Sequence, residues 1–153
     1  MITIRESALA ALVFGTFLTS TSYGQATQVG STLDVQGSPA EDVITIVFDA
    51  APGVARVFGV PGTPDGTEFF GVTRLVARTL ASTDILNVQS FSATPPELAV
   101  DTGTGDSQVR IDIATQFGLT PTFSKAIVRG ANGKDSVLFN IDENAFGSTY
   151  DWT

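Results

Sequence analysis

The sequence predicts an all-β protein, and three observations support this expectation. Short runs alternate apolar and polar residues: Val109, Ile111 and Ile113 would share one face of a strand, with Arg110 and Asp112 on the other. Such a period of two places one face in a core and the other in water. Gly, Pro and Asp separate the runs at short intervals. Finally, a similar unit recurs at intervals of roughly 20 to 30 residues, as in stacked repeats.

The predicted strands follow one another through residues 32–141. In order they are TLDVQ, VITIVF, VARVFGV, FFGVTRLVA, ILNV, ELAV, SQVRIDIA, KAIVR and SVLFNI. Residues 73–88 are the one stretch that a helix could occupy, but their leucines do not hold a 3.6-residue stripe and Thr and Val are frequent. We therefore predict strand there, and a loop over residues 115–124.

The N-terminus has the order of a secretory signal peptide. Arg5 precedes an apolar run over residues 8–18, and the small residues Gly24 and Ala26 follow a polar stretch. The apolar run is too short to cross a bilayer, which takes about 20 residues. The sequence thus predicts a signal peptide over residues 1–26, a single domain over residues 27–153 without a membrane span, and a secreted protein.

Composition excludes several functions. The chain has 8 Lys and Arg against 16 Asp and Glu, a net charge of −8. A field of that sign repels phosphate backbones, so no nucleic-acid partner is expected. The chain contains neither Cys nor His. A Ser-His-Asp triad, a Cys-His pair, a His-ligated zinc site and disulfides are therefore excluded, which leaves carboxylates, hydroxyls, Lys or Arg, and oxygen-ligated metals.

The recurring unit is an apolar pair, a turn of small residues, an Asp and a second alternating run. The four Asp residues are Asp42, Asp84, Asp106 and Asp135. Five glycines are expected to supply positive φ at the turns: Gly37, Gly103, Gly105, Gly130 and Gly133. The long first interval has room for an extra turn built on VARVFGV. This pattern predicts a right-handed parallel β-helix or β-solenoid of about five coils. A β-sandwich with ordinary hairpin turns explains the same residues and stays open.

The segments TEFFGVTRLVARTLASTDILNVQS, LAVDTGTGDSQVRIDI and IVRGANGKDSVLFNI resemble degenerate repeats of the parallel β-helix or β-solenoid proteins on bacterial surfaces. More distantly they resemble the Gly- and Asp-rich repeats of RTX-type calcium-binding proteins. The resemblance implies an adhesin, surface-layer component or stalk. Some parallel β-helices are polysaccharide lyases or glycosidases, so that alternative follows from the same resemblance.

The best candidate for a calcium-binding turn is GANGKDSVL, which matches the RTX pattern at Gly130, Gly133, Asp135 and Val137. Lys134 places a positive charge beside the would-be ligand, and the other units lack the required glycines. Calcium binds about six to eight oxygen atoms, and in the RTX repeat these atoms come from successive turns. We therefore expect a turn, no metal ligands and no cofactor.

Catalysis would require a pair of carboxylates across a cleft. The candidates are Glu97, Asp101, Asp106 and Asp112, and Arg110 or Arg129 could act beside them in a lyase. No pair is singled out by spacing, and the aromatic residues suited to sugar stacking, Tyr150 and Trp152, lie in the last residues of the chain. No catalytic residue is therefore predicted.

These observations predict a structural or adhesive protein of the cell surface or extracellular space, and not an enzyme. The alternatives are a small carbohydrate-active, lyase-like β-helix and a β-sandwich ligand-binding module. The expected partner is a surface or matrix component such as a polysaccharide. Self-association is a further expectation, because an uncapped end of a solenoid exposes strand edges.

Overall fold

The protein, seen in a computed structural model, is all-β. The structure describes residues 24–92, 94–114 and 125–141. The strands are β1 (Gln25–Val29), β2 (Thr32–Gln36), β3 (Val43–Phe48), β4 (Ala55–Phe58), β5 (Thr67–Phe69), β6 (Arg74–Arg78), β7 (Ile85–Ser90), β8 (Glu97–Asp101), β9 (Gln108–Ile113), β10 (Ala126–Arg129) and β11 (Ser136–Ile141).

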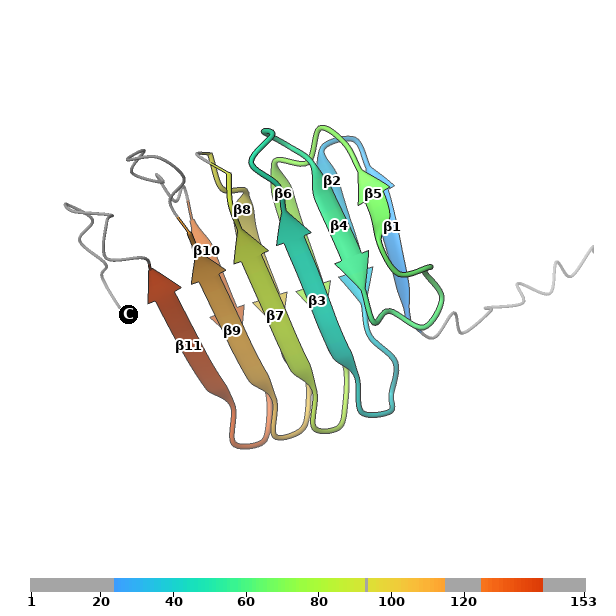
Figure 1. The fold of residues 1–153 in the computed structure, drawn as a ribbon. Coiled ribbons are helices and arrows are strands. Elements are labelled where there is room, and N and C mark those ends of the chain that lie inside the picture. Colours follow the sequence, from blue (N-terminus) through green and yellow to red (C-terminus); the bar gives the residue numbers. More distant parts are fainter. Residues whose placement is uncertain (1–23, 93, 115–124, 142–153) are drawn as a thin grey trace, which may run out of the picture.

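The strands form two mixed sheets that lie face to face (Figure 1). The first sheet has the order β1-β2-β6-β8-β10, and the second has the order β11-β9-β7-β3-β4-β5. The chain passes from a strand of the first sheet to one of the second four times in the described residues: β2 to β3, β6 to β7, β8 to β9 and β10 to β11. Each such pair of strands is called a unit below.

Successive units are parallel and in register in both sheets. Leu33 is opposite Leu75, and Leu75 is opposite Leu98. In the second sheet Leu86 is flanked by Ile44 and Val109 in the same way. Like residues thereby stack on like residues, and this stacking fixes the register because a one-residue slip would turn every apolar side chain toward water.

The core lies between the two sheets and consists of the inward residues that alternation predicts. Its buried members include Leu33, Val35, Ile44, Ile46, Phe48, Leu75, Leu86, Val88, Leu98, Val100, Val109 and Ile111. Residues 73–88, the stretch considered for a helix, form β6 and β7 joined by a corner. The prediction of strand there is confirmed, since β6 and β7 place Leu75 and Leu86 in the two facing sheets.

Antiparallel strands adjoin the first unit. β1 pairs with β2, while β4 pairs with β3 and β5 with β4, all antiparallel. The expectation that VARVFGV supplies an additional stacked turn is therefore wrong: the segment folds back on β3 as part of an edge meander. The predicted end of the leader, Ala26, falls inside β1, where Ala26 is opposite Val35.

The turns between the sheets are themselves stacked. Ala81, Thr104 and Asn132 form parallel bridges from one corner to the next. Gly103, Gly105 and Gly133 have the expected positive φ there, and a Cβ on any of them would collide with a carbonyl oxygen of the preceding corner. These glycines thus allow adjacent corners to approach.

Gly37 and Gly130 do not have the positive φ that was expected of them. A Cβ at Gly37 would lie 2.9 Å from Oδ2 of Asp42, and one at Gly130 would collide with Oδ2 of Asp135. Both glycines therefore make room for a carboxylate in the same unit, and the expectation of a left-handed turn at these two positions is wrong.

In the part of the chain that the structure describes, no helix is long and apolar enough to span a membrane. The expected loop over residues 115–124, and Tyr150 and Trp152, lie outside the described residues.

Candidate functional site

A ladder of polar side chains lines the corner where each unit turns into the second sheet. The residue before β3, β7, β9 and β11 is respectively Asp42, Asp84, Ser107 and Asp135. The backbone N–H of Asp42 donates to Oδ1 of Asp84 at 2.9 Å, and that of Ser107 donates to Oδ1 of Asp135 at 3.2 Å. The carboxylates thus bond one unit to the next, where a corner would otherwise leave buried N–H groups without partners.

Asp106, the Asp of its recurring unit in the sequence pattern, lies in the corner but one residue before the ladder position. Its carboxylate is exposed and accepts a hydrogen bond from the Lys134 backbone N–H at 2.8 Å. Ser107 is the buried member, and its side chain is 1% exposed. All four corners span six residues between their strands, and Asp106 occupies the fifth position of its corner, whereas Asp42, Asp84 and Asp135 occupy the sixth.

Asp84 is the most deeply buried carboxylate of the ladder, with no exposed surface. Its Oδ2 has no hydrogen-bond partner. Burial raises the pKa of Asp84 above its ordinary value of 3.8, an effect that hydrogen bonds with the Asp42 backbone and Thr79 side chain oppose and the charges of Asp42 and Glu41 reinforce. The group therefore favours its protonated form more than a solvated carboxylate does.

The GANGKDSVL stretch forms the last described corner, between β10 and β11. Asp135 accepts from the Ser107 backbone and the Lys134 backbone N–H is bonded to Asp106. Both acidic side chains therefore serve backbone groups of neighbouring units. Among the described residues, no group of three or more acidic side chains is placed to hold a metal ion.

The carboxylates considered for catalysis lie in different places. Glu97 and Asp101 are at the two ends of β8 in the first sheet, whereas Asp112 is on β9 in the second. Asp112 accepts hydrogen bonds from Arg110 Nε at 2.8 Å and from Asn140 Nδ2 at 2.6 Å. The structure thus brings none of the four candidates into a facing pair, and Arg110 and Asp112 form a polar cluster with Asn140.

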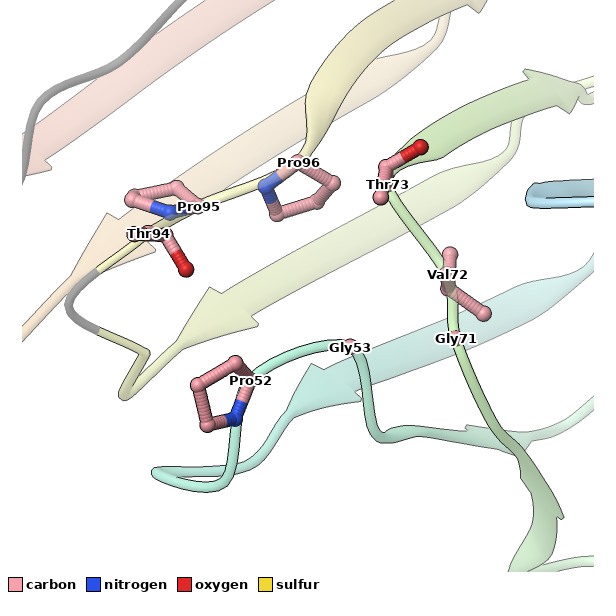
Figure 2. Close-up of a pocket in the computed structure, with 8 residues that line it drawn as sticks. All are labelled: Pro52, Gly53, Gly71, Val72, Thr73, Thr94, Pro95 and Pro96. Carbon is pink, nitrogen blue, oxygen red and sulfur yellow. The ribbon is translucent and has the colours of Figure 1, made fainter.

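A hollow of about 360 Å³ lies between the loops that precede β4, β6 and β8. Figure 2 shows the Pro52 ring on one side and the Pro95 and Pro96 rings on another, with Val72 on a third segment between Gly71 and Thr73. Its lining residues carry no charge, and Thr73 and Thr94 supply its only hydroxyl groups. The hollow offers apolar contact and no acid, base or nucleophile of the activated kind that catalysis needs.

Charged residues form aligned rows on the first sheet. The residues concerned are Arg74 and Arg78 at the ends of β6, Glu97 and Asp101 at the ends of β8, and Arg129 at the end of β10 with Lys125 just before that strand. Arg74 Nε lies 4.0 Å from Glu97 Oε2, and Arg78 reaches the other way to Asp34 Oδ1 at 2.7 Å. The sign of charge therefore changes at each step across the sheet, which favours this register over its alternatives.

Comparisons of the chain with protein-family models, with curated proteins and with solved structures give no match.

Sequence reasoning missed both the Ser107 member of the corner ladder and the charged rows. The rows had a signal: Arg74 and Arg78, Glu97 and Asp101, and Lys125 and Arg129 are each four residues apart. In a strand that spacing puts both side chains on one face. The signal becomes informative once the parallel pairing of the three strands is known.

Proposed function

We propose that the protein is a secreted, structural or adhesive β-solenoid of the cell surface or extracellular space, and that it is not an enzyme. The observation that carries the proposal is the in-register parallel ladder of four units in two sheets. Such stacking makes a rigid, extended surface from nearest-neighbour contacts, and that property suits a stalk or an adhesive scaffold.

The solenoid is favoured over a β-sandwich by the way in which the chain alternates between sheets. Each unit returns to the first sheet beside its predecessor, and the corner residues Ala81, Thr104 and Asn132 pair in parallel as the strands do. Sandwiches are built mainly from antiparallel hairpins and Greek keys. A right-handed path is proposed because parallel crossover connections take that hand in about 98% of cases.

The structural role is supported by what the polar groups do. Asp42, Asp84 and Asp135 are engaged in bonds with backbone or side-chain groups of the corners. A net charge of −8 suits a soluble protein outside the cell. The partner that we propose is a surface or matrix component such as a polysaccharide. It would bind to the polar outer faces of the sheets.

Export is tested by expressing the full chain in a bacterial host and analysing cell fractions. We expect the protein outside the inner membrane, shortened at its N-terminus, and N-terminal sequencing gives the cleavage point. Removal of residues 1–26 would take Gln25 and Ala26 from β1, so the sequencing also measures how much of that strand the exported protein keeps. A full-length protein confined to the cytoplasm would contradict the proposal.

A small carbohydrate-active β-helix is the alternative, and one observation favours it. Arg110, Asp112 and Asn140 are hydrogen-bonded together on two adjacent strands, a polar set that suits sugar hydroxyls or uronates. A lyase would release unsaturated sugars from acidic polysaccharides, seen as a rise in ultraviolet absorbance. Our proposal predicts binding to immobilised polysaccharide or cell surfaces with no such rise, and a rise that Arg110→Gln abolishes would favour the lyase.

A further inference from the structure

β10 is the terminal strand of the first sheet among the described residues, and one of its edges faces away from β8. The backbone N–H of Leu98 donates to the Lys125 carbonyl at 2.9 Å, and that of Thr102 donates to the Arg129 carbonyl at 2.8 Å. Because successive residues of a strand direct their N–H and C=O groups to opposite sides, Ala126 and Val128 direct theirs to the free edge.

β10 and the residue just before it carry two basic side chains that no described acid neutralises. Lys125 and Arg129 are exposed, and the ion pairs within the described residues join other groups. Arg129 is opposite Asp101, whose Oδ1 instead accepts from the Gly103 backbone N–H at 3.0 Å. The edge thus combines two free peptide groups with two positive charges four residues apart.

We propose that the edge of β10 binds an extended segment of a partner protein that bears two carboxylates four residues apart. The segment would lie parallel to β10, as β8 does on the other side, and its acids would lie beside Lys125 and Arg129. The sign change that runs from β6 through β8 to β10 would then continue for another step. Main-chain hydrogen bonds would supply affinity and the two acids would supply selectivity, as in other cases of strand addition.

A second copy of this chain does not fit the requirement. Glu97 and Asp101 are the only two acidic residues in the whole sequence that are four positions apart. They lie on β8, which is already paired on both sides, with β6 and β10. Another protein must therefore supply the acidic strand. This inference concerns the β10 edge alone and does not depend on export or on the structural role proposed above.

The test uses a peptide that copies residues 96–103, PELAVDTG, with a fluorescent label and the full-length protein. We expect saturable binding by fluorescence anisotropy that weakens as salt is added. The charge-reversed peptide PKLAVKTG should bind at least about tenfold more weakly, because two attractive cross-strand pairs become repulsive.

Variants identify the edge. Lys125→Glu combined with Arg129→Glu should reverse the preference between the two peptides, since both side chains are exposed and contribute no described ion pair. Val128→Pro should abolish binding of either peptide, because the lost N–H faces the free edge. Val128 also packs against the core, so Val128→Ala is measured beside it: this variant loses core packing but keeps the N–H, and it should still bind PELAVDTG. Arg110→Gln, in the other sheet, is the matched control and should bind PELAVDTG as the parent protein does.

Equal affinity for the two peptides, no binding of PELAVDTG at millimolar protein, or unchanged binding in Val128→Pro would each overturn the proposal. Concentration-dependent self-association of the parent protein that PELAVDTG fails to compete would also contradict it, since the edge would then be taken by a second copy.

Discussion

The backbone N–H of Asp42 donates to Oδ1 of Asp84 at 2.9 Å, although 42 residues separate them in the sequence. The bond joins the corner of one unit to the corner of the next. It gives a reason for the Asp that precedes each of β3, β7 and β11. The carboxylate accepts a hydrogen bond from a backbone N–H group of a corner, where strand pairing supplies no acceptor. The acceptor is buried and one of its oxygens has no partner, so its protonation affects stability.

We expect Asp84→Asn to change the pH dependence of stability. Burial raises the pKa of Asp84 in the folded protein above 3.8. The stabilisation from its proton is thus complete below pH 3.8 and is lost as the pH rises through the folded-state pKa. Asn is uncharged throughout, so the free energy of unfolding of the variant should increase relative to the parent as the pH is raised from about 4 to neutrality.

Urea denaturation at a series of pH values measures this difference. Asn132→Ala is the control, because it changes an exposed residue of another corner without removing a titratable group, and its pH profile should run parallel to that of the parent protein. Parallel pH profiles for the parent and Asp84→Asn would contradict the assignment of a raised pKa.

The stacking of corners predicts different costs for two glycine substitutions. Gly103 and Gly30 have similar positive φ values, 64° and 60°. A Cβ at Gly103 would collide with the Leu80 carbonyl oxygen, whereas nothing lies within 4 Å of a Cβ at Gly30. Gly30→Ala should therefore cost only the backbone strain, about 1 kcal/mol, and Gly103→Ala about 1–3 kcal/mol more. Thermal unfolding of both variants measures the difference, and equal losses would show that the corners are not in contact.

The core rows predict a large loss for truncation in the middle of the stack. Leu98 is 1% exposed between the Leu75 row and the Ala126 row. Leu98→Ala should lower the free energy of unfolding by about 2–5 kcal/mol. Leu138, which is 53% exposed on β11, gives the matched control, and Leu138→Ala should change stability by less than about 0.5 kcal/mol. Similar effects for the two substitutions would be inconsistent with this packing.

The charged rows predict that reversing the charge of β8 destabilises the fold. Glu97→Lys with Asp101→Lys would place a third basic strand between β6 and β10, and we expect a loss of about 1–3 kcal/mol that shrinks as salt is added. Adding Lys125→Glu and Arg129→Glu should recover part of the loss. Chemical denaturation at low and high salt measures both, and a loss that neither salt nor the second pair of changes reduces would point to a cause other than charge.

The sequence allowed the strands to be located but not their partners. Alternation in segments such as that from Val109 to Ile113 requires one buried face whatever the neighbouring strand is. Parallel and antiparallel pairing satisfy that requirement equally, which is why VARVFGV could be mistaken for another stacked turn. The role of Ser107 was missed for a similar reason, because Asp and Ser both suit a turn and only the start of β9 decides which of them is buried.

The candidate sites were less accessible to sequence reasoning than the strands. The free edge of β10 depends on the order of strands in the sheet, and the opposed charges of Arg78, Asp101 and Arg129 lie far apart in the sequence. Their relation appears only when the register is known. The turn expected at residues 130–135 needed no tertiary information, since Gly130, Gly133 and Asp135 favour a tight turn by their own conformational preferences.

Disulfide formation between engineered cysteines tests the parallel, in-register stacking of units most directly, because the native chain contains no Cys. Val76 is opposite Ala99 in the first sheet, and Asn87 is opposite Arg110 in the second. Partner positions on adjacent strands are about 4.8 Å apart, within the range that a disulfide spans. We predict rapid oxidation when Val76→Cys is combined with Ala99→Cys, and likewise when Asn87→Cys is combined with Arg110→Cys. Asn87→Cys combined with Asp112→Cys should give no disulfide, whereas efficient oxidation of this offset pair, or of neither partner pair, would contradict the stacked units.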